Sequence, residues 1–176
     1  MNKSQSLVLL PTRLHKLLNM WQNKRIGTEL PFRTSVVLRE LTPWLSNLAL
    51  LEGHPKTGYR FRVCGTGFLS RFGREATGQL LNTLPEEVCV DLNSRLDHAF
   101  FSHEPVATRI DVLQPGGMVS YAELILPLAL IEAIPQFFLA IHRLPPPPSY
   151  LHSAQLGTSN ESAGLGKTTV RPAGSC

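Results

Sequence analysis

Apolar residues recur with a helical period near the start of the chain. Between residues 13 and 25 they stand at i, i+3, i+4 and i+7, the spacing that gives a helix one apolar stripe. Gly27 follows this stretch and favours an end to the helix before it. Such a stripe must pack on the chain's own domain or on a partner, and we take it as the candidate docking or dimer surface. Its members are Leu14, Leu17, Leu18 and Trp21.

The period then changes to two, which indicates a pair of strands. Residues 47–53 are mostly apolar and end at a glycine, and residues 54–58 have the composition of a turn. In the strand predicted over 59–64, alternation places one apolar set on one face and a mainly basic set on the other. The apolar set is Tyr59, Phe61 and Val63, and the opposite set is Arg60, Arg62 and Cys64.

A long helix is predicted further along the chain. Thr83 followed by Glu86 matches the capping-box pattern, so we expect the helix to begin there. An apolar residue recurs every fourth position, and this gives the helix a buried face. The repeat consists of Val88, Leu92, Leu96 and Phe100, and the residues expected on the opposite, solvated face are Glu87, Asp91 and Arg95.

Three further strands are expected over residues 106–113, 118–128 and 136–142, with a strong turn signal in Gln-Pro-Gly-Gly between the first two. Neighbouring strands joined by turns pair antiparallel. Five antiparallel strands, with helices between the second and the third, make an α+β fold with those helices on one face of the sheet.

We divide the chain into three parts. Residues 1–10 are expected to be a loose start and residues 11–143 the domain. Residues 144–176 are rich in Pro, Ser, Gly and Thr, and their few large apolar groups cannot offset the entropy of ordering them, so we expect a flexible tail.

A ligand pocket, if the domain has one, should lie between the long helix and the sheet. A mainly apolar lining suits an apolar or weakly polar ligand, although the same residues can simply form a filled core. The candidate lining residues are Phe61, Val63, Phe68, Leu92, Leu96, Leu124 and Phe137.

Composition narrows the class of protein. With 176 residues and 43% apolar residues, the chain can bury a core. Its net charge of +4 comes from interspersed acids and bases, so we expect no nucleic-acid partner. Its three cysteines, Cys64, Cys89 and Cys176, form no metal-binding or disulfide pattern and favour the cytoplasm. The apolar stretch 122–141 carries two Glu and two Pro residues, which favours buried strands over a membrane span.

Candidate chemistry is sparse. Gly65-Thr66-Gly67 follows a strand, but the chain lacks the βαβ alternation of a dinucleotide site, so we interpret the glycines as a turn that needs positive φ. His98 or His103 could supply a base for Cys64, but nothing in the sequence places either one beside it, and a redox role for Cys64 or Cys89 stays open. Four arginines near the turn could meet an anion or pair with carboxylates such as Glu123; they are Arg60, Arg62, Arg71 and Arg74.

Two stretches carry a resemblance to a known family. The first contains Trp21, Arg25, Gly27, Leu30, Pro31 and Arg33; the second contains Phe61, Arg62, Gly65, Thr66, Gly73, Arg74, Thr77 and Gly78. With this spacing the chain resembles the PAS domain family over about residues 10–143, and most of all a bacterial branch of single PAS domains.

The resemblance implies a five-stranded sheet in the order 2-1-5-4-3 and a non-catalytic sensor or adaptor. Such a module regulates a separate signalling protein through ligand-dependent or dimer contacts, and it can form a homodimer. The resemblance carries over no obligatory cofactor. A flavin is not expected, because the chain contains no N-C-R-F-L-Q run, in which light-sensing relatives carry their flavin-adduct cysteine. Haem is not expected, because His98 points away from the apolar stripe of the long helix.

A second hypothesis stays open beside this one, in which the chain is a ligand-binding protein or enzyme of another α+β family. Acid/base groups would then have to converge in one cavity. The strand-borne candidates are Arg109, Asp111 and Glu123.

Overall fold

The computed structural model describes residues 10–131 and 134–146. Five antiparallel strands form one sheet in the order β2-β1-β5-β4-β3. The strands are β1 (Leu48–His54), β2 (Gly58–Cys64), β3 (Val106–Gln114), β4 (Gly117–Ile131) and β5 (Ile134–Arg143). The main helices are α2 (Thr12–Asn23), α3 (Leu38–Leu41), α4 (Gly67–Phe72) and α5 (Glu86–Ser102), and three short 3-10 turns are η1 (Arg33–Ser35), η2 (Leu45–Asn47) and η3 (Leu81–Thr83). The predicted fold class and strand order are therefore confirmed.

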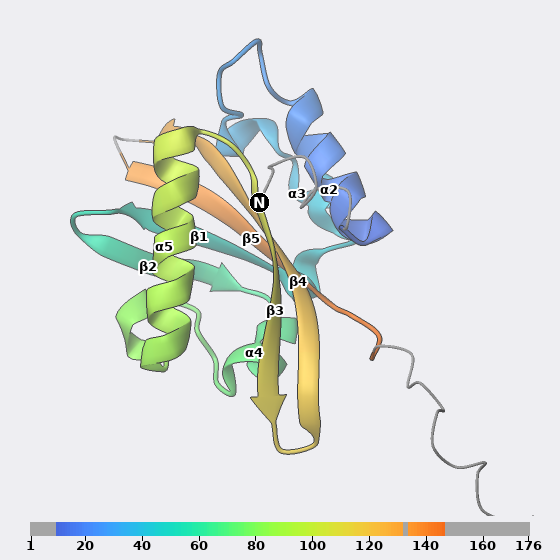
Figure 1. Cartoon of the computed structure of the whole chain (residues 1–176). Helices are drawn as coiled ribbons and strands as arrows, with labels where there is room; N and C mark the ends of the chain where they lie inside the picture. Colours follow the sequence, from blue (N-terminus) through green and yellow to red (C-terminus); the bar gives the residue numbers. More distant parts are fainter. Residues whose placement is uncertain (1–9, 132–133, 147–176) are drawn as a thin grey trace, which may run out of the picture. The chain divides into compact units, whose positions relative to one another are not determined.

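The sheet is buried on both faces by different parts of the chain. The helices between β2 and β3, α4 and α5, lie on one face, as predicted, and α2 and α3 lie on the other (Figure 1). We call the α5 side the inner face and the α2 side the outer face. Each face carries its own apolar cluster, so the sheet is the middle layer of three.

The alternation along β4 decides which side chains reach each face. Leu124 belongs to the outer cluster, whereas the next residue, Ile125, belongs to the inner one. The prediction that Leu124 lines a pocket beneath α5 is therefore wrong. Odd-numbered and even-numbered residues of this strand are both mainly apolar, because both of its faces are covered. The sequence pattern therefore could not show which residues lie on which face.

The N-terminal amphipathic helix is confirmed, but its apolar stripe is not an exposed docking surface. All four stripe residues are buried against the outer face of the chain's own sheet, and Trp21 is fully buried. We therefore correct the predicted partner or dimer surface at Leu14, Leu17, Leu18 and Trp21. The physical reason is that β4 and β5 present a second apolar face, which these residues cover.

A β-bulge corrects the predicted orientation of Val63. The pairing of β1 with β2 shifts between Leu50 and Leu51, so that Leu51 faces Phe61 and Leu50 faces Val63, with Arg62 as the extra residue. The bulge reverses the alternation after Phe61. Val63 is consequently 58% exposed, while Cys64 packs against the inner cluster.

Two details of the long helix also differ from the sequence patterns. Helix α5 follows Pro85 at its N-cap, and the hydroxyl of Thr83 donates to the carbonyl of Leu80, so the predicted capping box is wrong. Pro85 fits there because the first turn of a helix needs no N–H from that position. Arg95, expected in solvent, is buried with charged partners described below.

The predicted domain limits remain a prediction. Leu10 is buried in the outer cluster, and Leu144 packs against the same cluster. The rest of the predicted loose start and tail, residues 1–9 and 147–176, lies outside the described residues. Among the helices of the described residues, none has the length and apolarity that crossing a membrane requires.

Candidate functional site

An open groove with a volume of about 700 Å³ lies where the C-terminal end of α5 meets the connection of α2 to η1 and the adjoining ends of β4 and β5. Its size falls within the range of small-molecule sites. We call it the end groove. It is lined by Arg25, Thr28, Glu29, Leu30, Phe32, Phe100, Ser102, His103, Glu104, Pro127, Leu128, Ala129, Pro135 and Phe137.

One wall of the end groove is fixed by backbone contacts to β4. That strand runs past the start of β3, because Val106 pairs with Ile125 and residues 126–131 have no partner on β3. The indole Nε1 of Trp21 donates a 2.8 Å hydrogen bond to the Pro127 carbonyl, and the Ala129 N–H donates to the Pro31 carbonyl at 2.9 Å. Residues 25–31 are thus held along the part of the edge that β3 leaves open.

A tight turn projects from this wall. Ile26 and Glu29 form an isolated antiparallel bridge, and Gly27 takes φ +60°, the left-handed region that favours glycine. The motif residues between Trp21 and Pro31 therefore form one local structure. Ile26 is strongly exposed at this turn.

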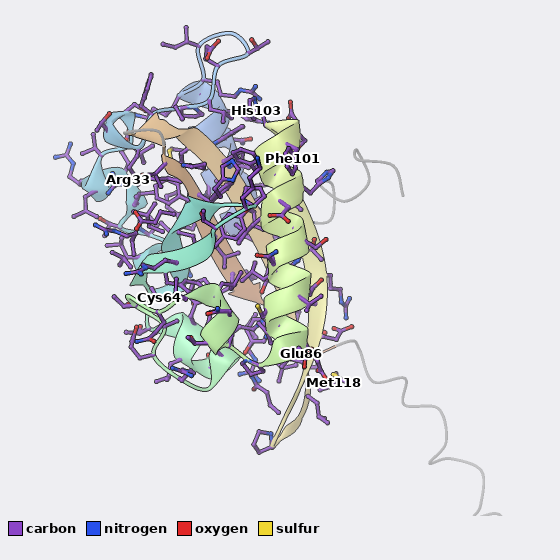
Figure 2. The ribbon with its side chains drawn as sticks, turned by 90° about the vertical axis from the view of Figure 1, so that its left-hand side faces the viewer. Arg33, Cys64, Glu86, Phe101, His103 and Met118 are labelled. Carbon is purple, nitrogen blue, oxygen red and sulfur yellow. The ribbon has the colours of Figure 1, made fainter. Side chains whose placement is uncertain are left out.

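The opposite wall is the end of α5. His103 closes the helix in a left-handed conformation, with φ 55°, and its N–H donates to the Ala99 carbonyl. Figure 2 shows His103 and Phe101 together at this end of the helix, with Glu86 at the other end. Phe100 lines the groove, and its ring meets Phe101 edge-on at 5.0 Å between centroids. Phe101 is itself 73% exposed. A groove residue is therefore in direct contact with a surface aromatic ring.

The polar rim of the groove centres on Arg25. Its guanidinium lies over the Trp21 ring at 5.1 Å, donates to the Thr28 carbonyl at 2.9 Å and lies 3.8 Å from the Glu104 carboxylate. The Nε of Arg25 is buried without a hydrogen-bond partner among the described residues. An apolar floor with polar groups along its rim, contributed by both walls, suits a small, mainly apolar ligand that carries a polar end.

Five of the seven predicted pocket residues do come together beneath α5. They belong to one buried cluster, in which Tyr59 meets Phe137 and Phe61 meets Phe72 in edge-on ring contacts. The five are Phe61, Phe68, Leu92, Leu96 and Phe137. Of these, Phe137 also lines the end groove, so the floor of the groove adjoins the inner core.

A buried ion-pair network ties α4 and α5 to the sheet. The carboxylate of Glu123 on β4 is 1% exposed and is shared by Arg71 of α4, at 3.3 Å, and by Arg95 of α5. Arg95 also reaches Asp91 at 2.7 Å, one turn earlier on the same helix. Of the two alternatives predicted for the arginines near the turn, an anion or a carboxylate partner, Arg71 therefore has the carboxylate partner. Arg62 lies 3.5 Å from Glu52, and Arg74 donates to the Thr83 carbonyl, so these two residues have local partners as well.

The glycines after β2 are required by close packing rather than by positive φ. A Cβ at Gly65 would lie 2.2 Å from the Leu45 carbonyl oxygen, and one at Gly67 would lie 2.0 Å from Asn47 Oδ1. Neither glycine is among those with positive φ, so that part of our interpretation is wrong. Thr77 and Gly78, the last residues of the second family motif, also have a structural role, because they hydrogen-bond to β2. Thr77 Oγ1 accepts from the Cys64 N–H, and the Gly78 N–H donates to the Phe61 carbonyl.

Burial, followed by the nearby charge of Glu75, raises the pKa of the Cys64 thiol to about 12. The thiolate is the reactive form of a cysteine. Cys64 is therefore held in its less reactive, protonated form at neutral pH.

The proposed acid/base candidates do not converge. Glu123 is enclosed on the inner face, whereas Arg109 and Asp111 are exposed and hydrogen-bond Ser120 on the outer side of the β3–β4 pair. His98 is exposed, as predicted. Over residues 10–131 and 134–146, no three His, Cys, Asp or Glu residues are grouped in a way that could hold a metal ion.

The end groove itself was missed by sequence reasoning. Its walls come from three segments far apart in the chain, and the sequence pattern assigns Phe100 only to a helical stripe. The available signal was the motif from Trp21 to Pro31, because its residues beyond the predicted helix follow neither a helical nor a strand period.

Comparison with known proteins agrees with the fold. A model of the PAS domain family matches residues 11–139, which covers most of the chain and all five strands except the end of β5. A search of curated proteins found no match.

Proposed function

Because the chain belongs to the PAS domain family, a family of sensor modules in signal transduction, we propose that it is a non-catalytic sensor that takes a small ligand in the end groove. The ligand is mainly apolar with a polar end, and its presence is passed to a separate signalling protein. The observation that carries this proposal is the contact between Phe100, which lines the groove, and the exposed Phe101.

The arrangement supports a relay because α5 is held unequally along its length. Arg95, near its middle, is tied to the buried Glu123 carboxylate of β4. Asp97 accepts a 2.6 Å hydrogen bond from the Tyr59 hydroxyl, so the anchored part extends to the start of the last turn. The last turn ends at Ser102 and is capped by His103, and Phe100, Ser102 and His103 all line the open groove. A ligand that packs against these residues would move the last turn of α5 relative to its anchored part, and Phe101 would move with it.

Ligand capture is tested by blocking the groove. The protein is purified natively, and small molecules that it retains are identified by mass spectrometry after denaturation. Ser102→Trp places a large side chain in the groove, and Ser94→Trp, on an exposed position of the same helix, is the matched control. We expect a small molecule to be retained by the parent protein and by S94W, but not by S102W. Equal recovery from S102W, or none from the parent, would contradict the proposal.

Transmission to a partner is tested on the surface of α5. Phe101 and Val90 are both strongly exposed apolar residues of this helix, but only Phe101 touches a groove residue. We expect Phe101→Ala to abolish co-purification of the signalling partner and Val90→Ala to preserve it. If both variants retain the partner, or both lose it, the assigned output surface is wrong.

The cytoplasm remains our prediction for the location of the protein.

A further inference from the structure

Strand β3 has one unpaired edge. It is the last strand of the sheet, and in residues 10–131 and 134–146 its main chain is hydrogen-bonded only to β4. None of its nine residues is fully buried. The other edge strand, β2, is covered, since the Phe61 N–H and C=O bond residues 79 and 78. An open edge of this length is a template for a further strand.

The register of the sheet identifies which groups point outward. The Leu144 N–H, which continues β5, donates to the Ser120 carbonyl, so the even-numbered residues of β4 direct their backbone groups toward β5. Odd-numbered residues such as Tyr121 and Glu123 therefore face β3, where they pair with Ile110 and Thr108. The remaining β3 residues direct their N–H and C=O groups away from the sheet. These are Ala107, Arg109, Asp111 and Leu113.

We propose that this edge pairs antiparallel with β3 of a second copy of the chain, about a two-fold axis at Ile110. In that register Arg109 lies opposite Asp111 of the second copy and Asp111 lies opposite its Arg109. Ala107 likewise lies opposite Leu113, which is 78% exposed in a single chain. Each residue whose backbone groups point outward is thus paired with another such residue of the second copy. Four such pairs, with two backbone hydrogen bonds each, give about eight interchain hydrogen bonds.

Charge selects this register over its neighbours. An axis at residue 109 or 111 also aligns the outward groups, but it places two arginines or two aspartates directly opposite each other, which is destabilising. Both charged side chains are available, since Arg109 and Asp111 are 60% and 52% exposed at the side chain and lie on the same face of the strand, 3.5 Å apart. The edge is thus self-complementary, as an interface with two-fold symmetry must be.

The edge strand also adjoins the end groove. His103 and Glu104 line the groove, and β3 begins two residues later at Val106. The inference rests on the proposed function for its regulatory meaning, because an occupant that moves residues 102–104 would also move the start of the paired edge. The pairing itself stands on the geometry of β3.

Charge reversal tests the pairing. Sedimentation of the full chain over a range of concentrations should show a monomer–dimer equilibrium. Arg109→Asp makes both cross-pairs repulsive and should weaken dimerisation about tenfold or more. Arg109→Asp/Asp111→Arg restores opposite charges and should return the dissociation constant to within about threefold of the parent. A monomer at all concentrations, or a dimer indifferent to R109D, would overturn the inference.

Cross-linking tests the register. The two copies of Ile110 face each other at the axis, close enough for a disulfide, whereas the two copies of Val112 are offset by four residues, about 14 Å. In a Cys176→Ser background, Ile110→Cys should form an interchain disulfide under mild oxidation and Val112→Cys should not. Equal cross-linking of the two, or none, would overturn the register.

Failure of the dimer can be told from failure of the sensor. Arg109 and Asp111 lie outside the end groove. A monomeric R109D variant that still retains the small molecule would support the pairing and the sensor together. Retention by a parent that shows no dimer at any concentration would leave the sensor and remove the pairing.

Discussion

Trp21 and Pro127, 106 residues apart in the chain, are joined by a buried hydrogen bond of 2.8 Å from the indole Nε1 to the carbonyl oxygen. This bond attaches the N-terminal helix to the part of β4 that extends past β3. It also sets the position of residues 25–31, which form a wall of the end groove. The integrity of the groove therefore depends on an interaction on the outer face of the sheet.

We expect Trp21→Phe to destabilise the protein by roughly 1–3 kcal/mol, because it keeps most of the ring but leaves the buried Pro127 carbonyl without a donor. Urea unfolding measures the change. Trp44→Phe is the matched control, since Trp44 Nε1 donates at 2.8 Å to the Arg13 carbonyl in a less buried place. A larger loss at Trp44 than at Trp21 would contradict this account of the outer face.

Glu123→Gln should cost about 3 kcal/mol of unfolding free energy, because it leaves Arg71 and Arg95 buried without their shared counter-charge. Asp91→Asn removes the second carboxylate that pairs with Arg95. Because the Asp91 side chain is 54% exposed, this change should cost about 0.5 kcal/mol or less. Thermal or urea unfolding of both variants provides the comparison. Similar costs for the two would show that the network is not buried as described.

Gly65→Ala should destabilise by about 2 kcal/mol, since the added Cβ would lie 2.2 Å from the Leu45 carbonyl and the backbone must shift. Gly116→Ala, where a Cβ meets no atom within 4 Å, is the control and should have little effect. Equal stabilities of the two variants would refute close packing as the reason for the glycine after β2.

His142 is expected to make stability pH-dependent. Burial, and then the charge of Arg13, lowers the pKa of its imidazole below the ordinary value of 6.5. The unfolded chain therefore binds a proton at a higher pH than the folded one, so this contribution is present above about pH 6.5 and is lost as the pH falls through the lowered pKa. Between pH 7.5 and 5.5, the parent should lose more unfolding free energy than His142→Gln, and parallel losses would contradict the assignment.

The sequence was sufficient for the fold but not for the distribution of side chains between its two faces. Helical and strand periods located all five strands and the long helix, because period reports which residues are buried together. Period does not say which layer covers them, and so Leu124 and the stripe of α2 were assigned to the wrong surroundings. A strand covered on both sides has no polar face to orient it.

The remaining errors come from single local events. One extra residue at the Arg62 bulge reversed the orientation of Val63, and no residue type in the run from Tyr59 to Cys64 announces a bulge. Arg95 looked solvated because its counter-charge, Glu123, lies 28 residues away. The end groove combines three distant segments, and only the folded chain brings them together.

Hydrogen exchange tests the central claim most directly. Amide exchange is compared, by mass spectrometry of peptides, between the natively purified protein and the same protein after its small molecules have been extracted. We predict slower exchange in the native sample at residues 25–31, 99–104 and 127–129, and little change in the middle of α5, which Glu123 anchors. Identical exchange in the two samples, or protection confined to residues 86–96, would contradict a ligand in the end groove.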